Sequence, residues 1–173
     1  MEYINLITNI FTCIGIIVAL LEFFYFRKSI LAENERVRKQ ATIDCYKEIC
    51  NDLYEINAII YKKYKRNEIL YEEINKDEKI KKVIKRYLNI MEWISTGINT
   101  GVYDLDVFDR LYGDVTIRMY SQLCDYITKR RKETGEIEIY QDYELMVKKL
   151  KEVHLKNKKQ LLNKNAEIKN KLG

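Results

Sequence analysis

The longest apolar stretch of the chain lies at its N-terminus. Between Tyr3 and Phe26 the only charged residue is Glu22. A helix over this stretch would be roughly 36 Å long, compared with about 30 Å for the hydrocarbon core of a bilayer. Arg27 and Lys28 follow the stretch, and no Lys or Arg precedes it. The pattern predicts a transmembrane anchor over residues 1–28 that spans the cell (inner) membrane once, with the C-terminal domain in the cytoplasm.

Small and polar residues within this stretch recur at alternating spacings of three and four, which places them on one face of a helix. Lipid gives helices no hydrophobic reason to associate, so small residues and hydrogen-bonding side chains mark the faces that pair. The first hypothesis is a homo-oligomer that packs along this seam. The alternative is a monomeric anchor whose Glu22 reaches the headgroup water. The seam consists of Asn5, Thr8, Thr12, Gly15, Ala19 and Glu22.

The next segment, residues 29–66, contains neither Gly nor Pro and keeps a helical period of apolar side chains. It predicts a juxtamembrane helical stalk that continues the membrane helix. Asn75 to Asp77 then forms a predicted turn, and Asp77 can cap the helix that follows. The periodic apolar positions of the stalk are Ile43, Tyr46, Cys50, Leu53, Ile56, Ile60 and Tyr64.

Residues 67–155 are predicted to form a helical cytoplasmic domain. Its clearest helix has apolar residues spaced four, three, four, three and four, and they are Ile80, Ile84, Tyr87, Met91, Ile94 and Ile98. A short helix is expected to stop at Gly113, and a second one to run from Asp114 to Ile127. Lys129 to Gly135 is a predicted loop, and Asp142 opens a last helix. Residues 156–173 form a basic C-terminal tail.

Composition supports helices throughout. The chain has no Pro and only six Gly, and its 47% hydrophobic and 33% charged residues exclude wholesale disorder. The predicted fold is all-α: an N-terminal transmembrane helix continuing into a stalk, followed by a small cytoplasmic helical bundle. The net charge of +5 comes from the C-terminal lysines. These are expected to contact membrane lipid, and nucleic acid is not an expected partner because no nucleic-acid motif accompanies them.

Motifs for catalysis or cofactor binding are not found in the sequence. It has no Gly-rich phosphate loop, no G-x-S-x-G and no H-E-x-x-H. The four cysteines lack metal-ligand spacing, and the only histidine, His154, is interpreted as a surface residue. An aspartate cluster could attract a hard cation, but helix capping explains these residues better. We therefore expect no enzyme activity, no cofactor and no metal. The cluster consists of Asp104, Asp106, Asp109 and Asp114.

Two charged residues interrupt strongly apolar helical segments. Glu92 lies beside Met91, and Arg118 lies between Ile117 and Met119. One hypothesis is an internal Glu92–Arg118 ion pair that fixes how two helices dock, which would serve specificity more than stability. The alternative is that both side chains lie on solvated faces.

Several short motifs in the second half of the chain resemble the bacterial family catalogued as domain of unknown function 4760. The resemblance implies an N-terminal span with a helical domain, and it brings no catalytic residues. By analogy with small single-span proteins in antiphage defence, it favours a membrane-anchored homo-oligomeric interaction or effector protein, which could perturb the membrane. The alternative is a passive scaffold that recruits a cytoplasmic protein partner. The motifs are Leu88 to Ile94, Gly97-Ile98, Gly101 to Asp104, Ile117-Arg118, Tyr126-Ile127, Arg130 to Lys132, Tyr140 and Tyr143 to Leu145.

Overall fold

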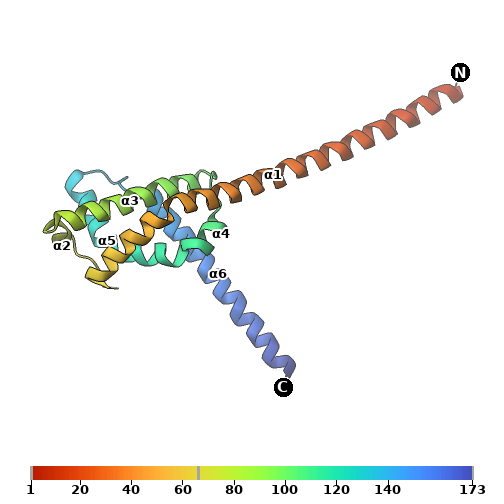
Figure 1. The fold of residues 1–173 in the computed structure, drawn as a ribbon. Coiled ribbons are helices and arrows are strands. Elements are labelled where there is room, and N and C mark those ends of the chain that lie inside the picture. Colours follow the sequence, from red (N-terminus) through yellow and green to blue (C-terminus); the bar gives the residue numbers. More distant parts are fainter. Residues whose placement is uncertain (1, 66, 173) are drawn as a thin grey trace. The chain divides into compact units, whose positions relative to one another are not determined.

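The computed structural model contains helices and no strand over the residues that it describes, which confirms the all-α prediction (Figure 1). It describes residues 2–65 and 67–172, with side chains over 14–65 and 67–158. The chain divides into two units, residues 1–40 and 41–173. The helices are α1 (Glu2–Tyr64), α2 (Tyr71–Asn75), α3 (Glu78–Asn99), α4 (Leu105–Phe108), the π-helical turn η1 (Asp109–Gly113), α5 (Asp114–Thr134) and α6 (Gln141–Leu172).

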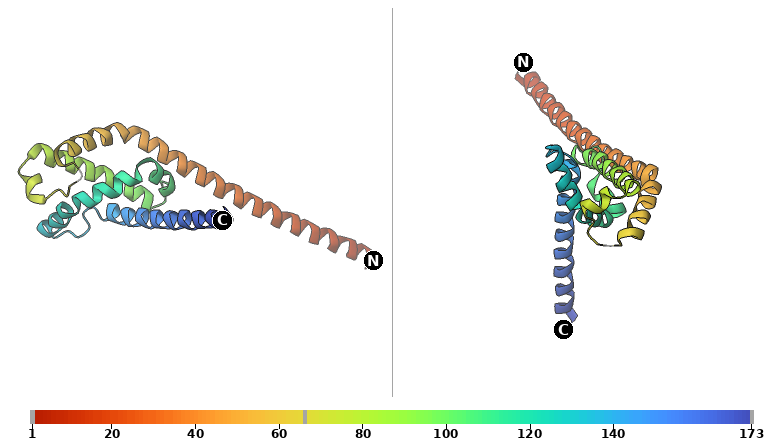
Figure 2. Two further views of the ribbon diagram at one scale, coloured as in Figure 1. Left: turned by 90° about the horizontal axis from the view of Figure 1, so that it is seen from below. Right: turned by 90° about the vertical axis from the view of Figure 1, so that its left-hand side faces the viewer.

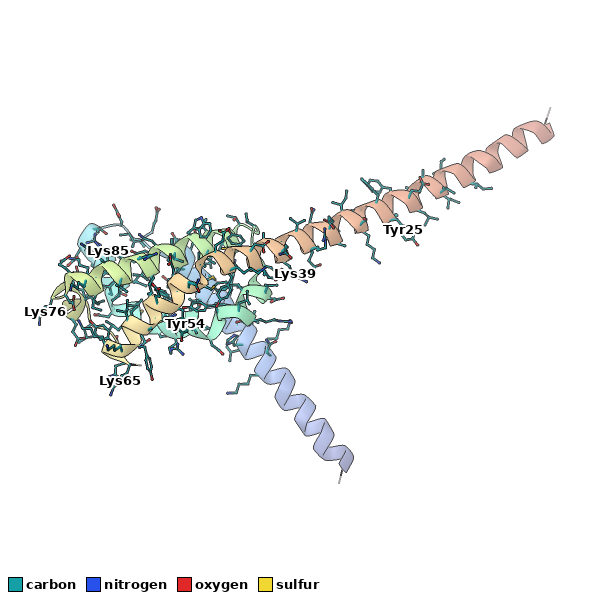
Figure 3. All side chains as sticks on the ribbon, in the orientation of Figure 1. Tyr25, Lys39, Tyr54, Lys65, Lys76 and Lys85 are labelled. Carbon is teal, nitrogen blue, oxygen red and sulfur yellow. The ribbon has the colours of Figure 1, made fainter. Side chains whose placement is uncertain are left out.

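The first unit consists of the N-terminal part of α1. All side chains described from Ile14 to Val37 are exposed, and Figure 3 shows those around Tyr25 projecting in several directions from the helix. Across the part of the chain that the structure describes, no helix is long and apolar enough to cross a membrane. The transmembrane helix predicted over residues 1–28 is thus not found among the described residues, and the side chains of residues 1–13 lie outside them.

The last part of α1 belongs to the second unit and differs from the predicted stalk. Four of its seven periodic apolar residues are buried in the core, with exposed fractions of 0% for Leu53 and 1% for Ile60. The other three, Ile43, Tyr46 and Cys50, are partly buried. The ion pair between Arg86 and Asp52, at 2.5 Å, joins this part of α1 to α3. The helical period was therefore predicted correctly. The face that it defines is covered by other helices of the unit, so this segment is part of the bundle.

Helix α3 contributes one buried face to the core of the second unit. All six apolar positions that predicted it are buried. Asp77 begins the helix as predicted, because its carboxylate accepts hydrogen bonds from the backbone amides of Lys79 and Ile80 at 3.0 and 3.1 Å. The buried face of α3 packs mainly against α6. Figure 2 shows the helices of this unit from two further sides.

Two predicted helix ends are wrong. The helical structure does not end at Gly113, because η1 leads directly into α5 and the backbone of Gly113 is helical. A Cβ atom at position 113 would lie 2.0 Å from Oδ1 of Asp109, so the missing side chain makes room for that carboxylate. The predicted loop from Lys129 is the last part of α5, which ends where Gly135 adopts a left-handed φ of 73°.

Candidate functional site

Two neighbouring cavities lie between the last part of α1 and the segment formed by η1 and α5. Their volumes are about 290 and 360 Å³, within or near the range of ligand sites. Tyr54, Asn57 and Arg118 line both of them. We call this feature the Arg118 groove. Its remaining lining residues are Tyr46, Cys50, Asn51, Ala58, Ile60, Tyr61, Lys65, Tyr112, Val115, Met119 and Gln122.

The walls of the groove are two helix faces. From α1 the wall includes Tyr46, Cys50, Tyr54, Asn57 and Tyr61, which follow one another in steps of three or four residues and therefore lie on one face of the helix. Lys65 lies directly after the end of α1. From Tyr46 to Tyr61 this row corresponds to roughly 22 Å of helix at about 1.5 Å per residue. The groove is therefore elongated along α1. Figure 3 labels two side chains of this wall, Tyr54 and Lys65.

Hydrogen bonds and ring contacts hold the two walls together beneath the groove. Asn57 Nδ2 donates to the hydroxyl of Tyr112, whose ring centroid lies 6.0 Å from that of Tyr46. Gln122 Nε2 donates to the carbonyl oxygen of Asn67 at 2.8 Å and secures the chain just after α1. Burial raises the pKa of Tyr112 to about 12, so this hydroxyl is protonated at neutral pH.

The groove is electropositive. Arg118 is partly buried, and it forms neither an ion pair nor a hydrogen bond with any side chain or backbone group that the structure describes. Lys65 adds a second cation at one end of the groove. No Asp or Glu is among the described residues that line either cavity. Tyr54 and Tyr61, with exposed fractions of 78% and 56%, provide large apolar surfaces beside these cations.

The structure corrects the Glu92–Arg118 hypothesis, because Glu92 has other partners. Its carboxylate accepts hydrogen bonds from the backbone amides of Asp142 and Tyr143, at 3.2 and 2.8 Å. These amides belong to the first turn of α6 and have no partner within their own helix. Burial raises the pKa of the Glu92 carboxyl group, and the two amides act in the opposite direction. The side chain of Glu92 thus caps α6 across the bundle.

This capping role predicts different stability effects for the two residues. Glu92→Gln should lower the free energy of unfolding by about 1 to 3 kcal/mol, because the side-chain amide turns a donor toward one of the backbone N–H groups. Arg118→Met should leave it unchanged or raise it by up to about 1 kcal/mol, since a partly buried cation without a partner is removed. Urea unfolding of the full chain in detergent micelles measures both values.

The double variant provides the control for this comparison. Because the two residues are not paired, the effects of Glu92→Gln and Arg118→Met should add. An ion pair would give a different result. Adding Arg118→Met to Glu92→Gln would then raise the free energy of unfolding clearly more than Arg118→Met does in the native chain.

The other residues singled out in the sequence occupy separate places. Gly15, Ala19 and Glu22 of the seam are exposed on α1, whereas Asn5, Thr8 and Thr12 lie outside the described side chains. Of the aspartates, Asp104 caps α4 through the amide of Val107, Asp106 lies in the first turn of that helix, and Asp114 begins α5. Within the described part of the chain no cluster of three His, Cys, Asp or Glu residues could hold a metal ion.

His154 is partly buried and has a carboxylate partner. Its Nε2 lies 2.6 Å from Oδ1 of Asp109, and its Nδ1 lies 3.7 Å from Asp114. The contact links α6 to the π-helical turn η1. The sequence did not indicate this pair, because 45 residues separate the two side chains.

The fold and the groove define a helical-bundle protein whose N-terminal helix carries exposed apolar side chains. The chain belongs to the family described as "domain of unknown function (DUF4760)", whose sequence profile matches residues 9–150. This confirms the family resemblance and extends it beyond the motifs that suggested it. Neither the curated proteins nor the solved structures contain a match to the chain.

Proposed function

We propose that the chain is a membrane-anchored interaction or effector protein that works as a homo-oligomer. The observation that supports the anchor is the exposed apolar surface of α1. The exposed fractions are 59%, 63% and 65% for Phe23, Phe24 and Phe26, and the preceding residues back to Ile14 are exposed in the same way. A helix that is apolar on all sides is stable in lipid or against other helices and not in water.

The direct test of the anchor is the distribution of the native chain between membrane and soluble fractions. We expect it in the membrane pellet, where it should resist washing at alkaline pH and dissolve only in detergent. A chain that remains in the supernatant after cell lysis contradicts the anchor.

The homo-oligomer proposal rests on the seam. An added Cβ at Gly15 would meet no atom within 4 Å, so nothing in its own described surroundings requires a glycine there. Close approach of a second helix would give a reason for it. Gly15→Leu should therefore weaken crosslinking between copies in native membranes, whereas Ile16→Leu, on a neighbouring face, should leave it unchanged. Equal crosslinking of both variants contradicts the seam.

The Arg118 groove favours a second candidate function, a passive membrane scaffold that recruits a cytoplasmic protein. The two candidates differ in what they require of the N-terminal helix. A membrane-perturbing effector should lose its effect on membrane permeability in Gly15→Leu and Glu22→Leu variants. A scaffold should tolerate both substitutions, because any apolar helix of similar length would hold it in place.

A further inference from the structure

The Arg118 groove has the composition of a protein-binding surface. Tyrosine and arginine are the residue types enriched at interaction hot spots, and acidic residues are depleted there. Tyr54, Tyr61 and Arg118 lie together on the groove, and no described lining residue is acidic. The arginine therefore faces a surface that offers it no counter-charge.

We propose that the Arg118 groove binds an acidic amphipathic helix of another protein. This inference rests on the interaction part of the proposed function and names the chemistry of the partner. A carboxylate of the partner helix would accept hydrogen bonds from the Arg118 guanidinium, which can bind both of its oxygens. Apolar side chains one turn away on that helix would pack against the rings of Tyr54 and Tyr61.

The shape of the groove supports a helix as the occupant. Two rows of side chains form its walls: the row on α1 runs over roughly 22 Å, and the row from Tyr112 to Gln122 on η1 and α5 runs over roughly 15 Å. The longer row exceeds the length of a compact small ligand and corresponds to about four turns of a helix. Amphipathic helices commonly bind in grooves of this kind and anchor at positions i, i+3, i+4 and i+7.

The charge of the groove supports an acidic partner. Arg118 and Lys65 contribute two positive charges, and no described lining residue compensates them. Arg118 is also partly buried, so its interaction with a bound carboxylate is screened less than one between fully exposed groups. A basic partner helix would be repelled, which gives the groove its specificity.

The test uses the full chain in detergent micelles and a display library of helical peptides as the probe. Recovered peptides should carry Asp or Glu flanked by Leu, Ile or Phe at helical spacing. When the strongest of them is synthesised with a fluorescent label, anisotropy should show that Arg118→Met weakens its binding at least about tenfold. Arg118→Lys, which keeps the charge, should retain part of the affinity.

Arg110→Met is the matched control, because Arg110 is exposed on η1 and lies outside the described lining of both cavities. It should change the affinity by less than about twofold. Recovery of no acidic peptide, or equal losses in Arg118→Met and Arg110→Met, overturns the proposal. Light scattering provides a further test. If the native chain is a larger oligomer than the Arg118→Met variant, the groove is occupied by a second copy of the chain, and the proposal is overturned.

The outcome is separable from that of the proposed anchor. A chain that is found in the membrane pellet but selects no acidic peptide overturns the groove assignment alone. A chain that selects acidic peptides through Arg118 but stays in the soluble fraction overturns the anchor alone.

Discussion

Two lysines placed in the apolar part of α1, by Ile14→Lys and Ile17→Lys, are expected to release the chain from the membrane fraction. Both side chains are exposed, with fractions of 51% and 57%, so neither change disturbs the helical bundle. Each lysine near the middle of a membrane-spanning helix costs about 2.5 to 3.5 kcal/mol of insertion free energy. Fractionation of cells that express the double variant, followed by immunoblotting of pellet and supernatant, measures the result.

The matched control carries the same two charges further along the same helix. Leu31→Lys and Val37→Lys also replace exposed apolar side chains, but they lie beyond Phe26 and among charged residues. This variant should remain in the pellet with the native chain. If Ile14→Lys with Ile17→Lys also remains there, the apolar part of α1 does not hold the chain in the membrane.

The sequence was sufficient to predict α3 because every signal for this helix is local. Asp77 lies three residues before the first buried apolar residue, and the six periodic positions end at Ile98, just before the turn at Gly101. Gly101 has a left-handed φ of 80°, which ends the helical path. The start, the buried face and the end of α3 could therefore all be predicted from residues close together in the sequence.

The cap on α6 and the Arg118 groove could not be predicted in this way, because each joins distant parts of the chain. Glu92 and the amide of Tyr143 are 51 residues apart, and their contact depends on how α3 and α6 pack. Asn57 and Tyr112 are 55 residues apart. One signal for the groove was nevertheless present: Tyr54, Asn57 and Tyr61 form a polar and aromatic row on a face of α1 adjacent to its buried row.

The helix ends near Gly113 and Lys129 were misplaced for a different reason. Glycine and a run of charged residues commonly mark loops. Here Gly113 leaves space for the Asp109 carboxylate. Arg131 extends from the last turns of α5 to the carboxylate of Glu144 at 2.8 Å, which stabilises helical structure in a highly charged segment. A local contact within η1 therefore explains Gly113, and a tertiary contact between α5 and α6 explains the end near Lys129.

Leu53→Ala is expected to lower the free energy of unfolding of the helical bundle by about 2 to 5 kcal/mol, the usual cost of removing a fully buried leucine side chain. The side chain has an exposed fraction of 0%, so the substitution leaves a cavity in the core. Urea unfolding of the full chain in micelles, followed by far-ultraviolet circular dichroism, measures the loss. Ile59→Ala is the matched control, because Ile59 lies on the same part of α1 with an exposed fraction of 45% and should cost less than about 1 kcal/mol. A free juxtamembrane stalk predicts equally small losses for the two variants, whereas a large loss for Leu53→Ala alone requires the last part of α1 to be a helix of the bundle.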